Sequence, residues 1–196
     1  MVLLIYRADF FYIVVCISLP GAAWCREERK MVEINDIPAE VRWSLATRAA
    51  SALPLAYAKV YRERHGSELG EISQGIWTEG GKAQGALARA FGMPLKGAGD
   101  VARAFSTLST VMLGPELKGD VEVAQGRDCA RVVTTSCPYL SRAREMGEDP
   151  AVSICPDCRS YCTAAVGSLN PAYGITFEDR MCLGGETCQM RIEPER

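Results

Sequence analysis

Apolar residues recur every three or four positions between Pro38 and His65, the period of a helix with one buried face. The positions expected to face inward are Val41, Leu45, Ala49, Leu53, Ala56 and Val60. Pro38 suits the first helical turn, where its missing N–H is not needed. Pro54 lies in the interior, so the sequence predicts a kink or a break there.

Two further helices are predicted before residue 115. The first spans residues 68–91 and the second residues 100–113, ending at Gly114 and Pro115. In the 68–91 helix we expect Ile72, Ile76, Ala83, Leu87 and Phe91 to face inward. Four glycines interrupt this helix: Gly75, Gly80, Gly81 and Gly85. Because each costs up to ~1 kcal/mol of helix propensity, they favour a place where another backbone or a ligand comes close.

After residue 115 the apolar period changes from helical to two, the pattern of strands. The segment "DVEVAQGRDCARVVTT" predicts a β-hairpin turning at residues 126–128, and "YGITFEDRMCLGGETCQMRIEP" predicts another turning at 184–186. Two short helices are expected between them. The predicted fold class is α+β: an N-terminal bundle of about three helices, then an antiparallel sheet of two hairpins with intervening cysteine-bearing helices.

The sequence predicts a separate segment at residues 1–30 and a single α+β domain at 31–196. This domain has a helical half (31–115) and a cysteine-rich half (116–196). The run from Phe10 to Leu19 is apolar and is followed by Pro20 and small residues, as in a signal peptide. It is too short for a stable membrane span. Asp9 and the scarcity of positive charge favour an over-extended start, with translation beginning at Met31; a signal or anchor and a real structural element are the alternatives. We therefore expect a cytoplasmic protein, with export if residues 1–25 are a genuine signal.

The length and net charge of the chain limit the classes of binding partner that we expect. The 196 residues suffice for one domain with a sizeable core, and 22 basic against 24 acidic side chains give a net charge of -2. No basic stripe alternates with aromatic residues, so we expect no nucleic-acid partner. A small-molecule ligand is the expected partner, and the oligomeric state is left open.

Six of the nine cysteines lie in the last third of the chain: Cys137, Cys155, Cys158, Cys162, Cys182 and Cys188. Pro156 favours the first turn of a helix, which would place Cys155 at its N-cap and the next two cysteines on the same face. In the last hairpin, a three-residue loop would set Cys182 opposite Cys188, with Cβ atoms about 4.5–5.5 Å apart. A straight strand would separate Cys129 from Cys137 by roughly 26 Å, at ~3.3 Å per residue. Cys129 is therefore not expected to share their site.

The six thiols predict a metal centre. Sites rich in thiolate and poor in histidine suit an iron–sulfur cluster or tetrahedral zinc, each of which commonly takes four cysteines. The sequence favours Cys137, Cys155, Cys158 and Cys188 as ligands, with Cys162 and Cys182 as substitutes. Three alternatives remain: buried apolar thiols, a thioredoxin-like dithiol at "CPDC", and disulfides if the chain is exported.

The order of elements, together with "CPYL" and "RMCLGGETCQMRI", resembles the L-2-amino-thiazoline-4-carboxylate hydrolases and the related hydrocarbon-binding domains of the 4-vinyl-reductase type. The resemblance covers roughly residues 41–192. It implies a small-molecule domain, and zinc binding by some sensory members implies a role for Cys182 and Cys188. The additional "CPDC" pair departs from that zinc pattern and favours an iron–sulfur cluster.

Other side chains suggest weaker hypotheses. His65 is expected at a solvated helix end, and Glu178, Asp179 and Glu186 are candidate acid–base groups for opening a small heterocycle. Aromatic side chains that could line an apolar pocket are Trp43, Trp77, Tyr57 and Tyr61. The sequence thus favours a metal-binding, small-molecule or sensory domain, because four protein ligands leave a metal no open position for substrate. A hydrolase acting on a cyclic C–N bond is the alternative.

Overall fold

The computed structural model describes residues 4–8, 11–15, 33–66 and 69–195, and the chain divides into two units, Met1–Ile37 and Pro38–Arg196. In the first unit, strands β1 (Leu4–Ala8) and β2 (Phe11–Val15) pair antiparallel, with Ile5 opposite Val14. A 3-10 turn, η1, follows at Ile34–Asp36. The predicted cleavage zone and the alternative start at Met31 lie outside the described residues.

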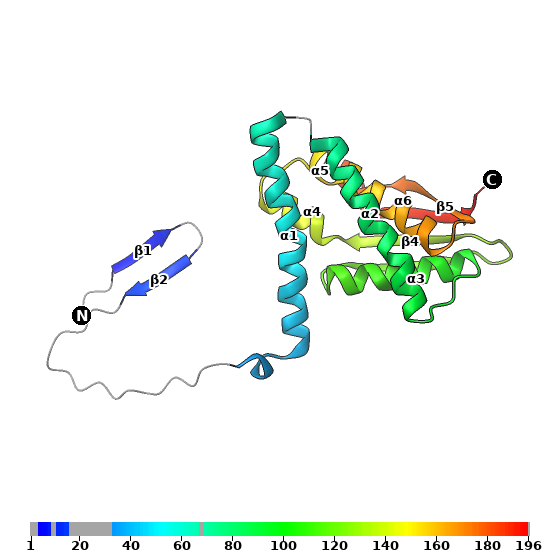
Figure 1. Cartoon of the computed structure of the whole chain (residues 1–196), viewed down its shortest axis with the longest axis horizontal. Coiled ribbons are helices and arrows are strands. Elements are labelled where there is room, and N and C mark those ends of the chain that lie inside the picture. The colour runs from blue at the N-terminus through cyan, green and yellow to red at the C-terminus, as the bar shows by residue number, and fades with distance from the viewer. Residues whose placement is uncertain (1–3, 9–10, 16–32, 67–68, 196) are drawn as a thin grey trace. The chain divides into compact units, whose positions relative to one another are not determined.

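The second unit begins with three helices: α1 (Ala39–His65), α2 (Leu69–Ala90) and α3 (Ala98–Leu113) (Figure 1). The predicted helices are confirmed, but α1 continues through Pro54 without a break. Pro54 and Ala50, whose carbonyl loses its helical partner, are both exposed, so water can satisfy that carbonyl. Among the described helices, none is both long and apolar enough to cross a bilayer.

Four strands form one antiparallel sheet in the order β3-β4-β6-β5. They are β3 (Lys118–Val123), β4 (Ala130–Ser136), β5 (Tyr173–Asp179) and β6 (Cys188–Pro194). Between β4 and β5 lie α4 (Pro138–Glu145), α5 (Pro150–Ser153) and α6 (Cys155–Leu169). The predicted α+β class is confirmed. The pairing of β4 with β6 joins the β3–β4 pair and the β5–β6 pair into a single sheet.

One face of the sheet packs against α3 and α6. In the central strands, Val132 lies opposite Met190 and Ala130 opposite Ile192, and all four are buried. The core that they form with the two helices includes Val101, Phe105, Leu108, Ala165, Val166 and Leu169. The other face is charged, because Glu178 pairs with both Arg131 and Arg191 there. The sheet therefore supports a site on its helix-covered side.

Helix α2 packs on α6 backbone to backbone. A Cβ atom at Gly81 would lie 2.3 Å from the carbonyl oxygen of Tyr161, and one at Gly85 would lie 2.2 Å from that of Ser168. Only glycine allows this approach. The expectation that the α2 glycines mark a close backbone contact is confirmed at these two positions, whereas Gly75 has nothing within 4 Å.

The inward faces predicted for α1 and α2 are wrong. Leu45 and Leu53 of α1 are exposed, as are Ile76 and Phe91 of α2. The inner face of α1 instead carries Thr47, Ser51 and Leu55, and that of α2 carries Gly81, Gln84, Gly85 and Ala88. In α2, small side chains lie inward because α6 approaches too closely for large ones.

Substituting alanine at the α2 glycines should separate the close contact from ordinary helix propensity. Gly81→Ala should lower the free energy of unfolding by about 1–3 kcal/mol, because a methyl group cannot fit against the backbone of α6. Gly75→Ala, in the same helix but in open space, should raise it by up to ~1 kcal/mol. Urea unfolding measures both, and shifts of the same sign would contradict this packing.

Candidate functional site

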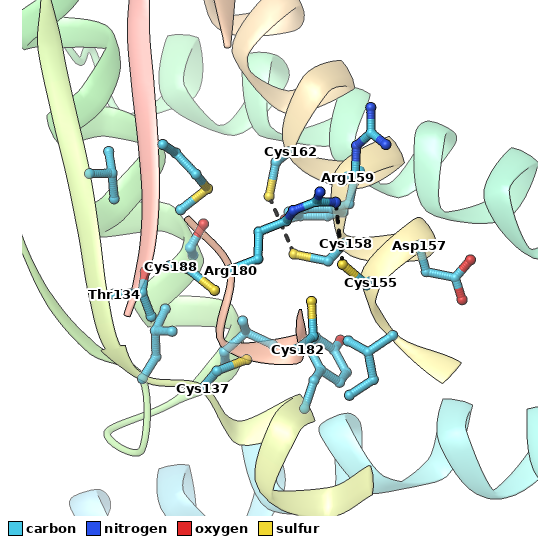
Figure 2. Close-up of a pocket in the computed structure, with 18 of the residues that line it drawn as sticks. Thr134, Cys137, Cys155, Asp157, Cys158, Arg159, Cys162, Arg180, Cys182 and Cys188 are labelled. Atoms are coloured by element: carbon cyan, nitrogen blue, oxygen red, sulfur yellow. Dashed lines mark hydrogen bonds between the residues drawn. The ribbon is translucent and has the colours of Figure 1, made fainter. Parts of the chain in front are cut away.

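Six thiols converge on one cavity of about 130 Å³ between the sheet and the helices (Figure 2). They belong to Cys137, Cys155, Cys158, Cys162, Cys182 and Cys188. These are the six cysteines that the sequence singled out, and Cys129 does not line the cavity. All six are free thiols in the structure.

The start of α6 presents three of these thiols on one face. The N-cap is Ile154, one residue earlier than expected. Cys155 is therefore the first residue of the helix and not its N-cap, and Pro156 follows it in the first turn. The Sγ atoms of Cys158 and Cys162, one turn apart, lie 3.8 Å from each other. The predicted convergence of the three thiols is confirmed.

Cys182 and Cys188 reach the cavity by a different route from the predicted hairpin. Strand β5 ends at Asp179, and Cys182 lies in a 3-10 turn, η3 (Met181–Leu183), so it does not oppose Cys188 across a ladder. Cys188 is instead in register with Thr134 of β4. The backbone N–H of Met181 donates to the Sγ of Cys188 at 3.3 Å, which holds the turn beside the first residue of β6.

Cys137 reaches the cavity from the junction between β4 and α4. It is the N-cap of α4, directly after β4, with Pro138 in the first turn of the helix. Strand β4 therefore separates Cys137, at its cavity end, from Cys129, which precedes its first residue. Figure 2 shows the sulfurs of Cys137 and Cys182 turned toward the same space as those of α6.

In the metal-free protein, the cavity favours the neutral thiol form of its cysteines over the thiolate form. Burial raises the pKa of Cys137 and of Cys188 to about 11 each. A hydrogen bond with Cys162, followed by burial, raises the pKa of Cys158, and burial with the neighbouring Cys155 raises that of Cys182. Thiolates would need a positive partner here, since charge without one is costly in a buried site.

Arg180 supplies one positive charge that the sequence analysis missed. Its Nη1 atom lies 3.6 Å from the Sγ of Cys155, and Figure 2 shows the guanidinium reaching between the α6 thiols. Arg159 also lines the cavity. The available signal was the position of Arg180, two residues before Cys182 in a segment already assigned to the site.

Aromatic and aliphatic side chains form the rest of the wall. Trp77 lies edge-on to Tyr139, with ring centroids 5.1 Å apart, and edge-on to Tyr161 at 6.2 Å. Phe105, Met112, Leu113, Leu117, Val132, Phe177 and Met190 also line the cavity. Trp77 was among the predicted pocket aromatics, but Trp43, Tyr57 and Tyr61 are not part of the wall.

One buried polar group lies behind this apolar wall. The Nε2 atom of Gln84 donates to the hydroxyl of Tyr161 at 2.8 Å and to that of Ser109 at 3.2 Å. The Tyr161 hydroxyl in turn donates to the sulfur of Met112 at 3.3 Å, a weak acceptor. Burial raises the pKa of Tyr161, so its hydroxyl remains a donor at neutral pH.

The predicted acid–base residues lie elsewhere. Glu178 is bound by arginines on the charged face of the sheet, and Asp179, Glu186 and His65 do not line the cavity. Of the described residues, Asp157 is the only carboxylate in the wall. It accepts a hydrogen bond from Ser73 at 2.6 Å, and Figure 2 shows it turned away from the thiols.

The donor set fits a thiophilic metal in type and number, since six sulfurs border one cavity beside a cation. Among residues 33–66 and 69–195, however, no three His, Cys, Asp or Glu side chains already stand at ligating positions. A metal would therefore need side-chain rotations to bring four sulfurs inward.

No protein-family profile and no curated protein matches the chain. Among solved structures, it is similar to the phenol-responsive sensory domain of the transcription activator PoxR, crystallised with phenol. The TM-score is 0.51 with 15% sequence identity, over 76% of this chain and 74% of that one. At this identity the likeness shows a shared fold, and the thiazoline-hydrolase resemblance remains a prediction.

Thiol modification should distinguish the cavity cysteines from Cys129 in metal-free, reduced protein. At pH 7, a pKa of about 11 leaves Cys137 and Cys188 on the order of 100-fold less thiolate than an ordinary cysteine. Iodoacetamide should therefore alkylate Cys129 before Cys137 and Cys188, as followed by peptide mass spectrometry. Labelling of Cys137 as fast as Cys129 would contradict the burial of that thiol.

Proposed function

We propose that this protein is a small-molecule-binding sensory domain whose ligand cavity is built beside a metal centre held by cysteines. The observation that carries the proposal is the convergence of six thiols, from four separate segments, on a cavity otherwise walled by aromatic and aliphatic side chains. A sensory domain with the same fold supports the small-molecule part of the proposal.

The metal would be an iron–sulfur cluster or zinc, bound by Cys137, Cys155, Cys158 and Cys188, with Cys162 and Cys182 as alternative ligands. Binding would replace the thiol protons, and the metal would supply the positive charge that buried thiolates lack. Arg180 supports an anionic centre because it already lies against Cys155. The metal would also tie α6 and α4 to the sheet, which gives it a structural role.

The ligand would be an apolar molecule about the size of one aromatic ring. In the metal-free protein, the cavity of about 130 Å³ is close to the roughly 150 Å³ that holds benzene in an engineered apolar cavity. The Tyr161 hydroxyl, which now donates only to the Met112 sulfur, can turn to a polar atom of the ligand. The phenol found with the related sensory domain is a ligand of this kind.

Sensing is favoured over catalysis by the composition of the wall. Four cysteine ligands would leave a metal no open position for water or substrate. Asp157, the one carboxylate described there, is engaged by Ser73. Among the described residues, the cavity thus offers the predicted hydrolysis of a small heterocycle no carboxylate other than Asp157.

Metal content tests the centre directly. The full chain, purified without oxygen, should contain stoichiometric iron with visible absorbance, or stoichiometric zinc without colour, by elemental analysis. A Cys137→Ser/Cys155→Ser/Cys188→Ser triple variant should retain less than half of that metal, because only three of the six cavity thiols remain and the centre needs four.

Cys129→Ser is the matched control and should keep the full metal content, since Cys129 lies outside the cavity. A stable, folded wild-type protein without metal would contradict the centre. Equal metal loss in the control and the triple variant would contradict its assignment to these residues.

Ligand binding can be tested with phenol by calorimetry. Tyr161→Phe should weaken phenol binding about fivefold, the effect of losing one hydrogen bond worth ~1 kcal/mol. Tyr61→Phe, which removes a hydroxyl outside the cavity, should leave the affinity unchanged. Unchanged binding in Tyr161→Phe would contradict the role of its hydroxyl, and absence of phenol binding in the wild type would contradict a ligand of this class.

A further inference from the structure

The outer face of α1 is apolar, which reverses the usual arrangement of a surface helix. Its inner side is attached mainly through polar groups: Lys59 and Arg62 bind Glu148, and Arg48 pairs with Glu116 and Glu145. Leu55 is buried, but five other large apolar side chains of α1 face away from the rest of the second unit. They are Val41, Leu45, Leu53, Tyr57 and Val60, with exposed fractions of 42, 59, 58, 71 and 50%.

This apolar stripe is large enough for a stable contact. Half-exposed side chains of this size leave on the order of 100 Å² each to water, so the five together present on the order of 500 Å². Exposed alanines at positions 46, 49 and 50 extend the same helix surface. The total approaches the ~800 Å² that each partner contributes to a standard protein interface.

The stripe is also self-complementary in charge. Arg42 and Glu63 continue it at spacings of three residues beyond Leu45 and Val60, one at each end. Neither takes part in an ion pair with any residue of the described chain. If two α1 helices pack antiparallel about the middle of the helix, Arg42 meets Glu63 of the partner subunit and Leu45 meets Val60 of the partner subunit.

We propose that the α1 stripe is the docking surface for a second copy of this chain, forming a two-fold symmetric dimer through antiparallel α1 helices. A two-fold interface uses the same patch on both subunits, so the ion pair between Arg42 and Glu63 forms twice, once at each end of the contact. This inference is independent of the metal centre and of the ligand.

The oligomeric state of the full chain tests the proposal by light scattering after size exclusion. The wild type should have twice the mass of one chain at micromolar concentration, and Leu53→Glu should be monomeric because it places two carboxylates at the centre of the apolar contact. Leu183→Glu is the matched control and should remain dimeric, since Leu183 is similarly exposed, at 55%, but belongs to η3 and not to α1. Circular dichroism should show that both variants are folded.

Charge reversal tests the antiparallel orientation. Arg42→Glu should weaken the dimer about tenfold, and adding Glu63→Arg to the same chain should restore it, because the two charges then meet again with their signs exchanged. A wild-type monomer at 100-micromolar concentration would overturn the proposal, including the case in which another segment of the chain covers α1. A dimer that withstands Leu53→Glu would also overturn it.

Discussion

The close contact between α2 and α6 is the constraint on which the site depends. Because Gly81 and Gly85 let the two backbones meet, α6 is held between α2 and the sheet. The same contact brings Trp77 of α2 against Tyr161 of α6. The packing of these two helices therefore positions both the thiol-bearing face of α6 and part of the aromatic wall. The cavity is thus a result of helix packing, and its chemistry comes from what the sequence places on α6.

The α6 half of the site could be predicted from the sequence, because its geometry is local. Pro156 fixes the start of a helix, and the spacing of Cys155, Cys158 and Cys162 then determines a common face. The position of Cys182 depends on a turn, and the alternation of apolar and polar residues does not reveal the form of that turn. The chain after Asp179 winds into a 3-10 turn ending at Gly184, with φ of +96°, so Cys182 reaches the cavity without facing Cys188 across strands.

The helix faces show a second limit of sequence periodicity. The spacing of Leu45 and Leu53 correctly predicts a helix, but it does not say whether these side chains are buried or exposed, and the structure leaves both exposed. In α2, the side that packs inward is recognised by its glycines, since small residues permit contacts that large ones prevent. Arg180 was missed for a similar reason, because a lone basic residue gains meaning only when the fold places it beside a thiol.

X-ray absorption of the anaerobically purified protein at the iron and zinc edges tests the central claim most directly. A centre held by these cysteines predicts an inner shell of sulfur at about 2.3 Å, with no nitrogen or oxygen ligands. A further iron shell would accompany a cluster. An inner shell dominated by nitrogen or oxygen, or the absence of either metal from folded protein, would contradict the account.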